Sequence, residues 1–310
     1  MINKNKENIV KSIFKFSGLL IVFLSVIFIG YVIENYWSAI NHGPDQFNIY
    51  KFIAGIFLIQ IYWFYQAIIF RFIYSKIDQK PNYISICRII FLNNLLAYIP
   101  GKIIGLIGVA NFSSKINLSS SSILWTIILF QVYSFISAGL VFLFLINFSN
   151  IENNNTQLII FSIFLGTCFL LFSNIFKTLL IKLFGFFKKF PKISIKDISF
   201  YSNIVSILLY TQSWIIAGLS LWFILNSFSL NWISIPEVII IWIVSYIIGQ
   251  LAIIAPAGIG ILEASLILLL SRIIPIDIVV YSVASFRIII ILTNFFPHII
   301  LTILSLNYKK

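Results

Sequence analysis

The chain has 310 residues, of which 60% are hydrophobic and only 10% are charged, and its mean hydropathy is +1.04. Soluble domains carry about a quarter of charged residues, so this composition excludes a soluble protein and predicts an all-α polytopic integral membrane protein. The net charge of +12 is concentrated in a few loops, as the positive-inside rule predicts, and we expect no nucleic-acid partner.

Apolar runs that could be membrane helices recur along the whole chain, which we treat as a single transmembrane domain, 1–310. They cover residues 16–33, 52–74, 89–110, 123–148, 157–176, 203–226, 238–270 and 278–306. A run of about 20 apolar residues is long enough to span a bilayer. The first run follows a basic segment without a small-residue cleavage site, so we expect a retained helix and not a removed signal peptide.

The charges of the loops predict how the chain is oriented. The segment 1–15 and the loop 177–202 are rich in lysine, and the chain ends in Lys309 and Lys310. Because basic loops stay on the cytoplasmic side, we expect a multi-pass protein of the inner (plasma) membrane, with both termini and the loop 177–202 in the cytoplasm.

With this orientation, two of the apolar runs do not cross the membrane. The run 89–110 must begin and end on the cytoplasmic side, and the run 238–270 must begin and end on the outer side. Each contains a proline near its middle, Pro100 and Pro256, and proline breaks a helix. The sequence therefore predicts about six spanning helices plus two re-entrant helical hairpins, with two kinked spanning helices as the alternative.

The two broken segments resemble one another. LLAYIPGKIIGLIG (95–108) and LAIIAPAGIGILEA (251–264) each contain an apolar helix, a proline, a small residue and spaced glycines in the same order. Two such segments that enter from opposite faces are typical of an inverted repeat, in which discontinuous helices meet near the middle of the membrane.

Charged residues inside apolar runs are functional candidates because burying a charge in lipid costs several kcal/mol. Lys102 follows Pro100 and Gly101, where a half-helix would begin. A helix N-terminus with a lysine can bind phosphate, although the lysine could instead extend to the membrane surface.

Two further charges lie in the last third of the chain. Glu263 follows Gly258 and Gly260, so it could cap a half-helix, pair with Lys102 or Arg287, bind a basic headgroup or carry a proton. Arg287 lies about ten residues into the last run, and we expect it to contact Glu263, a phosphate, or both, with purely structural pairing as the alternative.

Neutral polar residues would line the same interior or join helices by hydrogen bonds. They are Asn93, Asn94, Gln131, Gln250 and Asn294. The glycines of the second motif lack the preceding strand of a nucleotide loop, and the cysteines and histidines are isolated. We therefore expect no cofactor and no metal.

Four motifs occur along the chain in this order: Tyr98-Ile-Pro-Gly-Lys102, Phe130-Gln-Val-Tyr-Ser-Phe-Ile-Ser-Ala-Gly139, Pro256-Ala-Gly-Ile-Gly-Ile-Leu-Glu263 and Phe286-Arg287. In these motifs and their order the chain resembles the flippase-like transmembrane domain of lysylphosphatidylglycerol synthases. This resemblance covers nearly the whole chain. It implies movement of a charged lipid, either an aminoacylated phospholipid or a lipid-linked saccharide, between leaflets.

The chain departs from that family at three positions. Ala257 replaces a common glycine, and Gln131 and Leu106 stand where many members have glutamate, which puts proton coupling and recognition of a basic headgroup in question. Only a short tail follows the last helix, so we expect no synthase domain and no lysyl transfer.

The resulting hypothesis is a non-enzymatic translocase for cell-envelope synthesis. Its partners would be membrane lipids, anionic or saccharide-linked, and envelope-synthesis enzymes. The alternatives are a polytopic membrane glycosyltransferase and a non-catalytic assembly factor.

Overall fold

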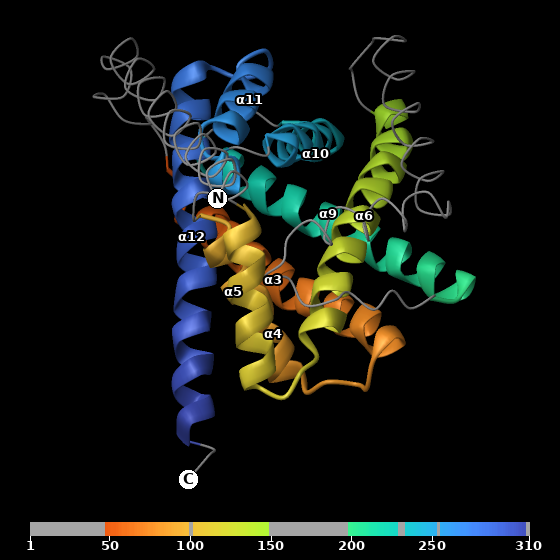
Figure 1. Ribbon diagram of the computed structural model, residues 1–310. Coiled ribbons are helices and arrows are strands. Elements are labelled where there is room, and N and C mark those ends of the chain that lie inside the picture. Colours follow the sequence, from red (N-terminus) through yellow and green to blue (C-terminus); the bar gives the residue numbers. More distant parts are fainter. Residues whose placement is uncertain (1–46, 99–101, 149–197, 229–232, 253–254, 308–310) are drawn as a thin grey trace, which may run out of the picture.

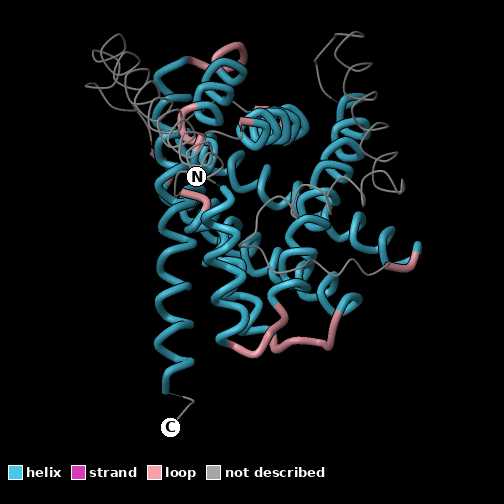
Figure 2. Tube along the Cα trace, viewed as in Figure 1, coloured by secondary structure: helices cyan, strands magenta, loops and turns pink. Residues whose placement is uncertain are grey.

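The computed structural model describes residues 47–98, 102–148, 198–228, 233–252 and 255–307, and all regular elements in these residues are helices (Figures 1 and 2). Four of them are long and apolar enough to cross a membrane: α3 (Ile49–Ile77), α6 (Ser120–Leu145, continued by the short 3-10 helix η1, Ile146–Phe148), α9 (Phe200–Phe228) and α12 (Ile276–Asn307). They confirm four of the six expected spanning helices. The expected helices 16–33 and 157–176, and the loop 177–202 up to residue 197, lie outside the described residues.

Two pairs of shorter helices replace the two apolar runs that contain a central proline. Hairpin 1 consists of α4 (Tyr83–Leu96) and α5 (Lys102–Lys115), and hairpin 2 consists of α10 (Ile235–Leu251), the 3-10 helix η2 (Pro256–Gly258) and α11 (Ile261–Leu270). A helix of 14 residues, such as α4 or α5, is about 21 Å long, which is too short for a hydrocarbon core of about 30 Å.

The two helices of each hairpin pack against each other, and this confirms that both segments are broken. In hairpin 1 the backbone of α5 approaches α4 so closely that a Cβ atom on Gly105 would lie 3.1 Å from the carbonyl oxygen of Leu96. In hairpin 2 a Cβ atom on Gly249 would lie 3.1 Å from Cβ of Leu262. Glycine therefore sets the close packing of both hairpins.

The described helices form two sets with the same order, which is a long helix, a hairpin and a second long helix. The first helices of the two sets, α3 and α9, pack side by side in opposite directions. The backbone N–H of Asn48 at the start of α3 donates to the carbonyl of Ser227 at the end of α9 over 2.8 Å. Further along, Ser220 Oγ donates to the carbonyl of Gly55 over 2.7 Å. This order and the opposite directions of α3 and α9 are those expected of an inverted repeat.

The last helix, α12, connects the two hairpins (Figure 1). Hairpin 1 lies along its C-terminal half, where Asn94 Nδ2 donates to Asn294 Oδ1 over 2.8 Å. Hairpin 2 lies beside its N-terminal half, through contacts of α11 with α12. The hairpins thus approach α12 from its two ends, and their tips meet near its middle.

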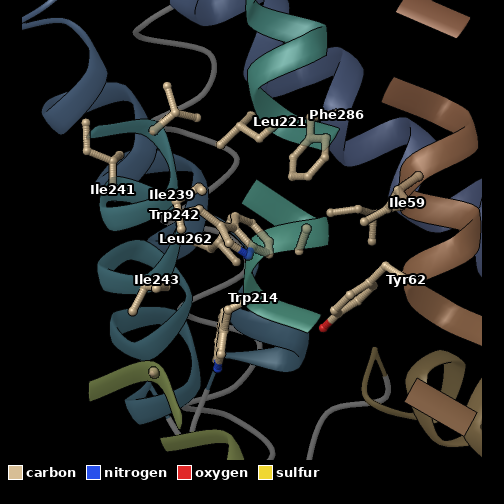
Figure 3. Packing of buried hydrophobic residues seen from close by; sticks show 14 of the residues in the cluster. Ile59, Tyr62, Trp214, Leu221, Ile239, Ile241, Trp242, Ile243, Leu262 and Phe286 are labelled. Carbon is tan, nitrogen blue, oxygen red and sulfur yellow. The ribbon is translucent and has the colours of Figure 1, made fainter. Parts of the chain in front are cut away.

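A large apolar core between the helices fixes this arrangement, and Figure 3 shows part of it. Trp214 of α9 is 2% exposed, and its indole N–H donates to the carbonyl of Ser134 over 3.1 Å and to Ser137 Oγ over 3.0 Å. Trp242 of α10 packs against Phe286 of α12 with ring centroids 5.3 Å apart. These aromatic contacts hold α6, α9, α10 and α12 around one interior.

Candidate functional site at the hairpin tips

The tip of hairpin 1 follows the end of α4. Ala97 caps that helix, and its N–H donates to the carbonyl of Asn93 over 3.0 Å. Tyr98 is the last described residue before the tip, and α5 begins at Lys102 as expected. The expected site residues Pro100 and Gly101 lie outside the described residues, and so does the side chain of Lys102.

The tip of hairpin 2 is an unusual backbone turn. Ala257, Gly258 and Gly260 all have positive φ angles, of 50°, 67° and 82°. Glycine adopts this region easily, whereas alanine does so at a cost. A Cβ atom on Gly258 would also lie 2.9 Å from the carbonyl oxygen of Gly249. These positive φ angles let the chain turn back into α11.

Glu263 lies in the first turn of α11 and caps that helix. Its Oε2 accepts a hydrogen bond from the N–H of Gly260 over 2.6 Å, as in a capping box. A carboxylate at this position also suits the positive end of the helix dipole. The side chain is buried, so its charge needs a partner inside the protein.

That partner is Arg287 of α12, whose Nε lies 3.0 Å from Glu263 Oε1. The same guanidinium donates from Nη2 to the carbonyl of Ala257 over 3.3 Å. It also lies over the ring of Tyr98, 5.2 Å from the centroid, a cation–π contact. Arg287 therefore joins the tip of hairpin 1 to the tip of hairpin 2, and the ion pair expected from the sequence is confirmed.

The position of Arg287 along α12 explains why this arginine is paired with a carboxylate. Arg287 is eleven residues after Ile276, the first residue of α12, which corresponds to about 16 Å along the helix and about half of a bilayer's hydrocarbon thickness. A lone charge at this depth is costly, whereas a charge with an opposite charge beside it is tolerated. The side chains of Arg287 and Glu263 are 15% and 11% exposed, so the pair is largely but not completely buried.

The other expected polar residues lie at different levels of the interior. Asn94 is joined to Asn294, which in turn donates from Nδ2 to the carbonyl of Ile290 over 2.7 Å. Gln131 lies on α6, and its buried Nε2 has no hydrogen-bond partner among the described residues. Asn94 therefore ties hairpin 1 to α12, while Gln131 belongs to another part of the bundle.

Two contacts of Arg287 could not be assigned from the sequence. One is the ring of Tyr98, for which the only signal was its place directly before the break in hairpin 1. The other is the carbonyl of Ala257, which a sequence pattern does not show. Within the described residues, no three of histidine, cysteine, aspartate and glutamate gather as metal ligands would.

Comparison with known protein families identifies the family to which the chain belongs. Residues 14–297 match the family model described as the lysylphosphatidylglycerol synthase TM region. No curated protein matches the chain.

Proposed function

Since the chain belongs to the lysylphosphatidylglycerol synthase TM region family, a family of membrane domains, we propose that it is a translocase which moves the headgroup of a charged lipid, or of a lipid-linked saccharide, between leaflets. The observation that carries this proposal is the Arg287–Glu263 pair, which lies at membrane depth where two broken hairpins meet.

A lipid phosphate that crosses the membrane loses its hydration and needs hydrogen-bond donors on the way. The guanidinium has five N–H donors in a planar fork that suits phosphate oxygens, and its described contacts use Nε and Nη2. The N-terminus of α5 at Lys102 adds backbone N–H groups and a cationic residue from the other hairpin. Helix α12 and hairpin 1 would therefore both supply donors for an anion.

Glu263 has a separate task in this mechanism. When no headgroup is present, its carboxylate neutralises Arg287. A phosphate would bind the guanidinium N–H groups that the Glu263 and Ala257 contacts leave over, because a planar guanidinium has five donors. Glu263 would keep its pairing with Nε and its cap of α11 through Gly260, so no buried carboxylate loses its cation.

The sequence contains no nucleotide-binding loop, so transport is driven by a lipid gradient, an ion or a partner enzyme of envelope synthesis. The lysine-rich termini favour the plasma membrane with both termini in the cytoplasm.

The test is lipid movement in vesicles that contain the purified full-length protein. Fluorescent phosphatidylglycerol and lysylphosphatidylglycerol are each placed in one leaflet, and the fraction that reaches the other leaflet is followed by quenching. Arg287→Gln should slow movement about tenfold or more, as expected for a lost charge-assisted contact. The matched control is Arg272→Gln, because Arg272 is exposed after α11.

Equal rates for wild type and Arg287→Gln would contradict the site. Vesicles in which the wild-type protein moves no lipid would instead favour the assembly-factor alternative, provided that the protein is folded.

A further inference from the structure

A second cationic side chain lies on hairpin 1, near the end opposite to its tip. Arg88 belongs to α4, and its guanidinium lies over the ring of Phe112 in α5, 5.0 Å from the centroid. The C-terminal half of α12 packs beside α4 (Figure 1), and Leu301 of α12 packs with Phe112 against one apolar cluster that includes much of α4. His298, one turn before Leu301, lies within electrostatic reach of Arg88. Three helices therefore meet around Arg88.

Arg88 and His298 each have a buried nitrogen without a hydrogen-bond partner among the described residues. These atoms are Nε of Arg88 and Nδ1 of His298. Arg287 has Glu263 beside it, whereas no carboxylate of the described residues forms an ion pair with Arg88. A partly buried cation needs a counter-charge, so this junction of helices is suited to an anion.

An arginine near a membrane surface can instead extend its head to water. This explanation does not fit Arg88, because its Nε is buried and its guanidinium rests on a ring of the neighbouring helix. Lys76 of α3 is the contrasting case. Its ammonium lies 4.9 Å from the ring centroid of Phe72 in the same helix, and the residue is exposed. The head of Arg88 is therefore held between helices, where that of Lys76 is not.

The position of His298 along α12 indicates which anion is within reach. His298 is eleven residues after Arg287, which corresponds to about 16 Å along the helix. Since Arg287 lies near the middle of a hydrocarbon core of about 30 Å, His298 lies at the edge of that core. Lipid phosphates are found at this level, and exposed apolar side chains of α12, Phe295, Ile299 and Ile300, offer a surface for acyl chains beside it.

The charges around this end of hairpin 1 favour an anionic lipid. Lys76, Lys80 and Lys115 lie at the end of α3, before α4 and at the end of α5. Asp78 is the one acidic residue between 71 and 120, and it accepts from Ser122 Oγ over 2.7 Å. Basic segments of this kind stay on the cytoplasmic side and attract the anionic lipids of that leaflet.

We propose that Arg88 and His298 hold the phosphate of an anionic phospholipid of the cytoplasmic leaflet, and that this lipid stays bound between hairpin 1 and α12. A lipid phosphate accepts hydrogen bonds, and Nε–H of arginine and the Nδ1–H tautomer of histidine both donate. The lipid would join two elements that the Asn94–Asn294 hydrogen bond already links nearer the tip. It is not the cargo, so this inference goes beyond the proposed function and does not require that the protein moves lipid.

The experiment measures binding to the delipidated full-length protein in detergent, together with the melting temperature, for three probes. Phosphatidylglycerol has a phosphate and acyl chains, diacylglycerol has only the chains, and inorganic phosphate has only the anion. The variants are Arg88→Gln and His298→Phe. The matched control is Lys76→Gln, which removes an exposed cation that also lies on a phenylalanine ring. Each protein is also made with Arg287→Gln, so that binding at the ion pair does not contribute.

We expect phosphatidylglycerol to bind the wild-type protein and raise its melting temperature, and the other two probes to do neither. Arg88→Gln should weaken this binding about tenfold, as for a lost charge-assisted hydrogen bond, and His298→Phe about fivefold. Neither change should lower the melting temperature without lipid, because neither nitrogen has a partner among the described residues. Lys76→Gln should bind like the wild type.

Three results would overturn the inference. They are equal binding of phosphatidylglycerol by wild type and Arg88→Gln, an equal loss in Lys76→Gln, which would reduce the site to general positive charge, and inorganic phosphate acting as well as the lipid. Arg88-dependent binding together with unchanged lipid movement in Arg287→Gln would contradict the proposed transport site and leave this lipid site supported.

Discussion

The Arg287–Glu263 pair can be tested by a double-mutant cycle with Glu263→Gln, Arg287→Gln and both changes together. Two unit charges 3.0 Å apart attract each other by about 5 kcal/mol at an effective dielectric constant of about 20. Desolvation of the two groups offsets much of this attraction, and removing one partner of a buried pair costs about 3–5 kcal/mol. Because the two side chains keep 15% and 11% exposure, we expect each single change to cost about 3 kcal/mol.

The double variant has no unpaired charge, so it should cost less than the sum of the two single changes. We expect a coupling energy of about 2 kcal/mol, measured by thermal or denaturant unfolding of the purified protein in detergent. Glutamine at 263 keeps an oxygen that can accept from the N–H of Gly260, so the cap of α11 survives in all variants. The cycle therefore isolates the ion pair from the helix cap.

Additive costs, within about 0.5 kcal/mol, would refute the pair. Arg272→Gln, which changes an exposed arginine, should alter the unfolding free energy by no more than about 0.5 kcal/mol. A larger effect of this control would mean that loss of any arginine destabilises the protein in detergent, and the cycle would then have to be repeated in lipid.

Two further changes test the surroundings of the pair. Ala257→Gly should raise the unfolding free energy by about 0.5–1 kcal/mol, because Ala257 has a φ of 50° that glycine adopts without strain; an unchanged or lower melting temperature would contradict the turn. Asn94→Leu should lower stability by about 1–2 kcal/mol, because it leaves the buried Asn294 without the hydrogen bond to α4, and a melting temperature equal to that of wild type would contradict this contact.

Much of the fold could be predicted because the membrane imposes simple constraints. The positions of lysine and arginine in the loops predicted which runs cross, and Pro100 and Pro256 marked the two runs that the structure shows to be broken. The hairpins are longer than expected, since α4 begins at Tyr83 and α5 continues to Lys115. Their ends contain polar residues such as Asn82, whose side chain caps α4, so hydropathy alone placed the boundaries too far inward.

The ion pair could be predicted because an arginine deep in an apolar run needs a counter-charge, and Glu263 was a carboxylate in another such run. The contacts with Tyr98 and with the carbonyl of Ala257 could not. The buried position of Gln66 on α3 was also missed. Helices in a membrane are apolar on both the lipid face and the protein face, so the sequence does not show which side of α3 points inward.

In the proposed transport cycle the phosphate would stay beside Arg287, which contacts the tips of both hairpins, while the hairpins rearrange around it. This rearrangement would change which leaflet reaches the phosphate position, as alternating access around a central site requires.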